Sequence, residues 1–207
     1  MIDTINQIAA IHREVAKKGT DDGEVVSVLL RREYNAEVDD VWHALTDPAR
    51  VQRWFMPVSG DLREGGDFQL EGNAGGKILR CDPPRLLRTT FGGDTSLVEL
   101  RLTPAGDGRT ALELEHNVPL VFAGSGAGAL YVGPGWDGAF LGLGLFLDGE
   151  VIDDPVAAAS SPEAQQFSRQ SIDAWTTVIE TSGTAAEDEI SAARAMSLAQ
   201  FAPDGAN

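Results

Sequence analysis

The first third of the chain shows a helical pattern followed by a strand pattern. Apolar residues recur every three to four positions from Ile5 to Val15, which is the spacing of an amphipathic helix. The polar stretch 17–23 contains two glycines and two aspartates, and it is expected to end this helix. The next segment, 24–34, is rich in Val and Leu and predicts the first strand of a sheet.

Two short helices are predicted after that strand. Within residues 37–45 the apolar side chains fall on one face of a helix. Asp47 and Pro48 then have the residue types of an N-cap and of a first helical position. The pattern therefore predicts a tight corner between the two helices.

The region 60–116 breaks into short apolar runs separated by Gly-Gly, Pro-Pro and Gly-Asp-Gly turns, which is typical of an antiparallel meander. In two of these runs apolar and charged residues alternate, as the two-residue period of a strand requires. The positions that share the apolar face are Val98, Leu100 and Leu102 in one run and Leu112, Leu114 and His116 in the other.

The segment 121–135 is rich in glycine and is predicted to be a loop. From Gly135 onward, large apolar residues fall at helical spacing, and they are Trp136, Phe140, Leu143 and Leu147. This predicted helix contains three more glycines, each of which lowers its propensity by up to about 1 kcal/mol relative to alanine. We therefore expect the helix to be held by packing against the sheet.

The last part of the chain predicts two more helices. Ser161 and Pro162 form an N-cap and first-turn pair, and the helix after them carries Phe167, Ile172, Trp175 and Ile179. Thr184 and Glu187 have the spacing of a capping box for a final helix that reaches about Phe201. We expect this extension to pack on the main domain or on a second copy of the chain.

Composition narrows the class of protein. A length of 207 residues suggests one core domain with extensions, and the net charge of −16 disfavours nucleic acids and anionic membranes as partners. Cys81 is the single cysteine, which excludes an intramolecular disulfide and a cysteine-rich metal site. The N-terminus lacks the apolar core of a signal peptide, and the longest apolar stretch, 138–147, is too short to cross a bilayer. These features predict a cytoplasmic protein.

Several segments resemble a known family. They are Val41-Trp42-His43-Ala44-Leu45-Thr46-Asp47-Pro48, Trp54-Phe55, the region 75–91 with Cys81-Asp82-Pro83-Pro84-Arg85-Leu86, and Gly135-Trp136. Together they resemble the AHSA1-like family of the START-like, polyketide cyclase and Bet v 1-like (SRPBCC) superfamily. Glu37 and Phe91 depart from the family pattern, since a proline and a tryptophan are common at these two positions.

The resemblance implies an α+β helix-grip fold, in which a curved antiparallel sheet wraps around a long C-terminal helix. It covers residues 24–150, so we expect a START-like domain there, an N-terminal helical extension over 1–20 and a C-terminal helical extension over 161–203. Such folds enclose a cavity between sheet and helix. The residues expected to line it are Trp54, Phe68, Leu70, Phe91, Leu100, Leu112, His116, Trp136, Phe140 and Leu143.

His116 is the polar residue of this set, and two interpretations of it stay open. It is either a histidine satisfied by a partner at the end of its strand or a hydrogen-bonding group for a ligand. His12, His43 and His116 lack the spacing of a metal site, and the glycine-rich stretch 124–128 lacks the residues of a phosphate loop or nucleophile elbow. We therefore expect no metal and no cofactor.

Three classes of function remain. The first is binding of a small hydrophobic or aromatic molecule, such as a lipid or a polyketide-like compound, in the cavity. The second is a protein-interaction module related to the Hsp90 ATPase activators. The third, a cyclase or hydrolase, needs inward-facing acid and base groups, and His116 is the single candidate. The sequence favours the binding protein over an enzyme and leaves a homodimer open.

Overall fold

A computed structural model describes residues 3–21 and 23–203 of the chain. Its internal contacts define two compact units. The first takes in the chain up to Leu30, then Asn117–Phe140 and the chain from Ala157 onward. The second consists of Arg31–His116 and Leu141–Val156.

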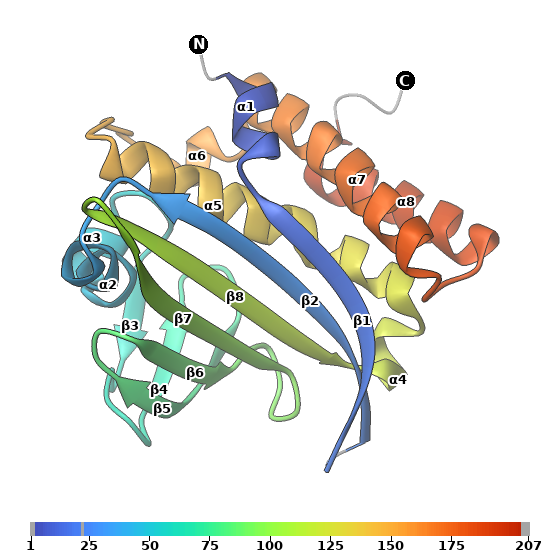
Figure 1. The fold of residues 1–207 in the computed structure, drawn as a ribbon, viewed down its shortest axis with the longest axis horizontal. Coiled ribbons are helices and arrows are strands. Elements are labelled where there is room, and N and C mark those ends of the chain that lie inside the picture. The colour runs from blue at the N-terminus through green and yellow to red at the C-terminus, as the bar shows by residue number, and fades with distance from the viewer. Residues whose placement is uncertain (1–2, 22, 204–207) are drawn as a thin grey trace. The chain divides into compact units, whose positions relative to one another are not determined.

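The described residues form one eight-stranded sheet. Its strands are β1 (His12–Thr20), β2 (Gly23–Tyr34), β3 (Val58–Gly60), β4 (Asp67–Leu70), β5 (Gly75–Asp82), β6 (Leu86–Thr90), β7 (Leu97–Gly106) and β8 (Arg109–Pro119). They hydrogen-bond in the order β1-β2-β8-β7-β6-β5-β4-β3 (Figure 1). Because β3 to β8 are each paired with the next strand along the chain, the predicted meander is confirmed.

Helices precede, interrupt and follow the sheet. They are α1 (Thr4–Ala9), α2 (Val38–Thr46), α3 (Pro48–Val51), α4 (Leu120–Ala123), the 3₁₀ helix η1 (Gly126–Tyr131), α5 (Gly133–Leu147), α6 (Pro155–Ala158), α7 (Pro162–Ser182) and α8 (Glu187–Phe201). Two predicted caps are confirmed, since Asp47 Oδ1 accepts from Ala49 N at 2.9 Å and Ser161 Oγ accepts from Ala164 N at 3.2 Å. The α+β class is also confirmed, and so is the succession of a strand, two short helices, the meander and, later in the chain, a long helix from β2 to α5.

The prediction of a helix reaching Val15 is wrong in its second half. Helix α1 ends at Ala9, and the chain then continues as strand β1. Ile11 and Val15 are buried, and the side chain of Arg13 between them is only 6% exposed, so every second residue points inward. Ile11 and Val15 satisfy a period of four and a period of two equally well, and pairing with β2 selects the strand.

Two predictions around the C-terminal helices are also wrong. The segment 121–135 is not a loop, because it contains α4, η1 and the first turn of α5. The expected capping box of Thr184 and Glu187 is absent: Ala186 is the N-cap of α8, and the Glu189 carboxylate accepts from the Ala186 backbone N–H at 2.8 Å. Thr184 Oγ1 instead shares a hydrogen bond of 2.7 Å with Ser182 Oγ.

Two glycines of α5 lie where other parts of the second unit touch the helix. A Cβ on Gly142 would stand 2.9 Å from the carbonyl oxygen of Trp54, and one on Gly144 would stand 2.8 Å from Nη2 of Arg32. The Trp54 carbonyl belongs to the backbone, so position 142 requires glycine, whereas a side chain at position 144 would displace the end of the Arg32 side chain. The glycines lower the helix propensity of α5, and close packing of the helix backbone offsets this loss, as expected.

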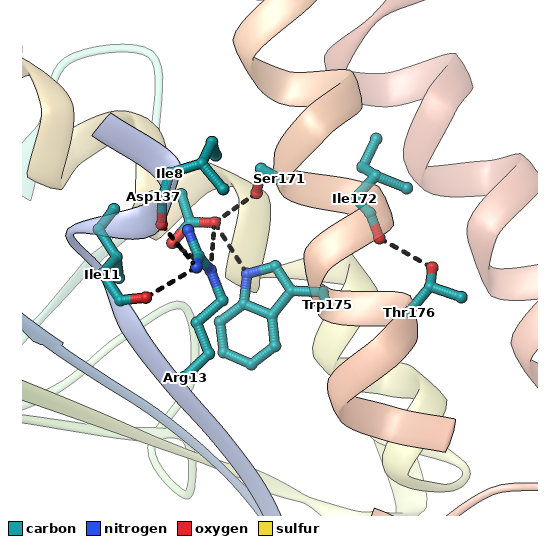
Figure 2. A network of polar contacts seen from close by, with 8 residues as sticks. All are labelled: Ile8, Ile11, Arg13, Asp137, Ser171, Ile172, Trp175 and Thr176. Carbon is teal, nitrogen blue, oxygen red and sulfur yellow. Dashed lines mark hydrogen bonds and ion pairs between the residues drawn. The ribbon is translucent and has the colours of Figure 1, made fainter. Parts of the chain in front are cut away.

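In the first unit, a single carboxylate joins three elements (Figure 2). Asp137 of α5 is fully buried and accepts from Arg13 Nε of β1 at 2.9 and 3.2 Å. From α7, Trp175 Nε1 donates to it at 3.1 Å and the Ser171 hydroxyl donates as well. Burial raises the pKa of the Asp137 carboxyl, while the Arg13 guanidinium and the donors from α7 oppose that rise.

The apolar residues predicted for α7 form its buried side. Phe167, Ile172, Trp175 and Ile179 are each at most 2% exposed, and α7 packs against α1, β1, η1 and α8 within the first unit. A Cβ on Gly133 would lie 2.5 Å from Cε2 of Trp175, so the start of α5 also lies directly against this helix. Helix α7 is therefore an integral part of the core of its unit.

We expect Asp137→Ala to lower the free energy of unfolding by about 3–5 kcal/mol, because it leaves the Arg13 guanidinium buried without its counter-charge. Urea denaturation measures this loss. Asp173→Ala is the matched control, because it breaks the ion pair with Arg194, whose two side chains are 63% and 41% exposed. That change should cost less than about 1 kcal/mol. Equal losses in the two variants would contradict the role given to Asp137.

Candidate functional site

One side of the meander collects apolar side chains, and we call it the inner face. The register pairs Leu87 with Leu100 and Thr89 with Val98 between β6 and β7. Thr89 is also paired with Ile78 of β5. Residues directly opposite each other on paired strands project to the same side. Alternation along each strand then extends the inner face to Phe68 and Leu70 on β4, Phe91 after β6, and Leu112, Leu114 and His116 on β8.

A histidine and a serine form a polar pair on the inner face. His116 Nε2 and Ser96 Oγ are 2.8 Å apart. The Phe91 ring meets the imidazole edge-on, with 5.8 Å between the two ring centroids. The centroids of the Phe68 and Phe91 rings are 6.4 Å apart. The site therefore combines two aromatic rings with one hydrogen-bonded pair.

The turn between β6 and β7 positions Ser96. Phe91 N donates to Ser96 O at 2.8 Å, which closes the turn, and Gly92 has a φ of +72° that glycine adopts without steric cost. Ser96 then precedes β7 by one residue, in phase with Val98 and Leu100. This phase brings the Ser96 side chain to the inner face beside β8.

Burial determines the state of His116. The residue is only 3% exposed, and burial lowers the pKa of its imidazole to about 4. The ring is therefore neutral near pH 7, with one nitrogen donating and the other accepting. Of the two interpretations left open by the sequence, the satisfied histidine is supported, because Ser96 provides a partner for Nε2.

The other predicted site residues fall into three groups. Phe68, Phe91 and Leu100 are half-buried on the inner face, whereas Leu70 and Leu112 of the same face are buried. Trp54 and Leu143 are also buried in the second unit, and Trp54 Nε1 donates to Ala44 O at 2.9 Å.

Trp136 and Phe140 belong to the first unit. Their participation in a site with the inner face stays a prediction.

Ser96 is a site residue that the sequence interpretation missed. The signal was present, because the alternation of Val98, Leu100 and Leu102 continues back by two residues to Ser96. The contact with His116 joins residues 20 positions apart, and only the pairing of strands brings them together.

The opposite side of the sheet is charged. Glu113 of β8 pairs with Arg31 of β2 and, at 3.4 Å, with Arg101 of β7. Glu99 pairs with Arg101 and, at 3.9 Å, with Arg88 of β6. The outer face of these strands therefore carries a ladder of alternating charges, whereas the inner face is apolar.

Two further features are absent from the described part of the chain. Residues 3–21 and 23–203 contain no group of three or more His, Cys, Asp or Glu side chains placed to hold a metal ion. Over the same residues, no helix has both the length and the hydropathy needed to cross a bilayer.

The fold and the inner face define a helix-grip protein, and comparison with known sequences identifies its family. Residues 35–143 match the family described as "Activator of Hsp90 ATPase homolog 1-like protein". The match spans more than half of the chain, so the chain belongs to the AHSA1 family, as the resemblance predicted. No curated protein matches it significantly.

Solved structures agree with this assignment. The crystal structure of CalU16 from Micromonospora echinospora is 39% identical, with a TM-score of 0.69, and the match covers 82% of this chain and 98% of that one. The solution structure of CalU16 gives 40% identity, a TM-score of 0.70, and coverage of 84% and 97%. DynU16, described as a putative protein in the dynemicin biosynthetic locus, is 25% identical with a TM-score of 0.51, covering 59% of this chain and 47% of that one.

We expect the stability that His116 confers to depend on pH. The folded state keeps the ring neutral down to about pH 4, whereas the unfolded chain binds a proton below about 6.5, so acid favours unfolding. Relative to that of His116→Gln, the free energy of unfolding of the wild-type chain should fall by about 3 kcal/mol between pH 7 and pH 4. Urea denaturation of both proteins across this range measures the difference. A difference that stays constant with pH would contradict the buried neutral state.

Proposed function

We propose that the inner face of the second unit binds a small hydrophobic or aromatic molecule. The observation that carries the proposal is the group formed by Phe68, Phe91, Ser96 and His116. Its two aromatic side chains are half-buried and border a hydrogen-bonded polar pair. Ligand sites in proteins combine apolar surface with a few placed polar groups in this way.

The relatives support this kind of function. CalU16 matches over nearly its whole length, and DynU16 is described as belonging to a biosynthetic locus. Together with the helix-grip fold, this favours a lipid or a polyketide-like compound as the ligand class.

The ligand surface buried on binding determines the affinity that we expect. Burying about 400 Å² of ligand surface contributes on the order of 10 kcal/mol at about 25 cal/mol per Å². Association costs at least about 4 kcal/mol in lost freedom of motion. We therefore expect dissociation constants in the micromolar to millimolar range.

A second candidate function is protein interaction, and one observation favours it. Val121 and Phe122 on α4 are 83% and 72% exposed, and adjacent exposed apolar residues are a common feature of protein contacts. The family description suggests Hsp90 as the partner to test. Stimulation of Hsp90 ATPase by the wild-type chain, lost in Phe122→Ser, would favour this function over the first.

Aromatic probes test the binding proposal directly. We expect 2-methylnaphthalene and 2-naphthol to bind the wild-type chain in ligand-observed NMR and calorimetry. Phe91→Leu should weaken the binding of both probes by about fivefold, because it removes an aromatic contact worth about 1 kcal/mol.

Phe122→Leu is the control, since the same substitution is made at a phenylalanine that is 72% exposed. Its affinity should equal that of the wild-type chain. Absence of binding by both probes, or equal weakening in both variants, would contradict the proposed site.

A further inference from the structure

We propose that Ser96 is the group that hydrogen-bonds the ligand, that His116 positions it, and that the ligand carries a phenol-like hydroxyl. This inference rests on the proposed function and specifies the ligand class for the same site. The juxtaposition that carries it is the hydroxyl of a half-buried serine residue, held 2.8 Å from a buried imidazole beside the Phe91 ring.

Relative burial identifies which of the two groups reaches a ligand. His116 is 3% exposed and lies behind the edge contact with Phe91, whereas Ser96 is half-buried at the end of a turn. A molecule resting on Phe91 therefore meets the Ser96 hydroxyl before it meets the imidazole. His116 acts through Ser96, because its Nε2 fixes the direction of that hydroxyl.

The Ser96 hydroxyl has hydrogen-bonding positions left for a ligand. A hydroxyl has one donor and two acceptor positions. Among residues 3–21 and 23–203, Ser96 Oγ hydrogen-bonds His116 Nε2, and this bond uses one of the three positions. At least one acceptor position remains, and the donor position also remains when the imidazole is the donor of the pair.

The chemistry of the pair selects the class of ligand group. Ser96 and the neutral imidazole offer no charge, so a carboxylate or an ammonium group would lose its hydration without an opposite charge in return. A hydroxyl both donates and accepts, which suits either arrangement of the Ser96 proton. The neighbouring rings of Phe91 and Phe68 favour an aromatic carrier for that hydroxyl.

Two probes of equal shape test the inference on the full chain. 2-Naphthol carries a hydroxyl where 2-methylnaphthalene carries a methyl group. Calorimetry should show that Ser96→Ala weakens the binding of 2-naphthol by about fivefold. The affinity for 2-methylnaphthalene should stay within a factor of two of the wild-type value. Thr95→Ala, on the same turn and exposed, should change neither affinity.

The positioning role of His116 has its own test. The amide of His116→Gln can still hydrogen-bond Ser96 Oγ, so this variant should keep the preference for 2-naphthol. The leucine of His116→Leu fills the space of the imidazole but offers no hydrogen bond. This variant should lose the preference for 2-naphthol over 2-methylnaphthalene, as Ser96→Ala does. Loss of the preference in both His116 variants, with thermal midpoints showing both folded, would overturn the positioning role.

A measurement on the unaltered chain covers the case of a variant that does not fold. In NMR titrations, 2-naphthol should shift the Ser96 amide and the His116 ring signals more than 2-methylnaphthalene does. Binding of both probes with equal shifts, or with equal effects of Ser96→Ala, would overturn this inference and leave the proposed function intact. Binding of neither probe would overturn the proposed function and this inference with it.

Discussion

Side chains alternate between the two sides of each strand in the meander, and the site depends on this alternation. The register that places Leu87 opposite Leu100 gathers apolar side chains on the inner face. The same register leaves Glu99 and Glu113 on the outer face, where arginines pair with them. A slip of one residue in β8 would exchange the two sides and move His116 into the charged ladder. The charged outer face therefore helps to hold the register that builds the inner one.

The first unit depends on a different interaction, the buried carboxylate of Asp137. Arg13 and Asp137 are 124 residues apart in the chain, yet both are desolvated and face each other at 2.9 Å. Because a buried charge without a partner is costly, each of the two residues requires the other. The donors from α7 complete the coordination of the carboxylate, which ties the C-terminal helices to the unit that contains β1 and the first half of α5.

The sequence predicted features that depend on local periodicity and missed those that depend on contacts between distant segments. The two-residue alternation and the glycine turns gave the meander, and the Asp47-Pro48 and Ser161-Pro162 pairs gave two helix starts. Strand β1 was missed because its apolar spacing also fits a helix. Of the site, alternation predicted the inward direction of His116, but its hydrogen bond with Ser96 needs the pairing of two strands that no local pattern reveals.

The central claim is that a small aromatic molecule binds on the inner face beside Phe91 and Ser96. The most direct test is a crystal structure with 6-bromo-2-naphthol, in which the anomalous signal of bromine locates the ligand. We expect the bromine next to the Phe68 and Phe91 rings, with the naphthol oxygen within hydrogen-bonding distance of Ser96 Oγ. An inner face filled by its own side chains, with bromine found only elsewhere on the protein, would contradict the claim.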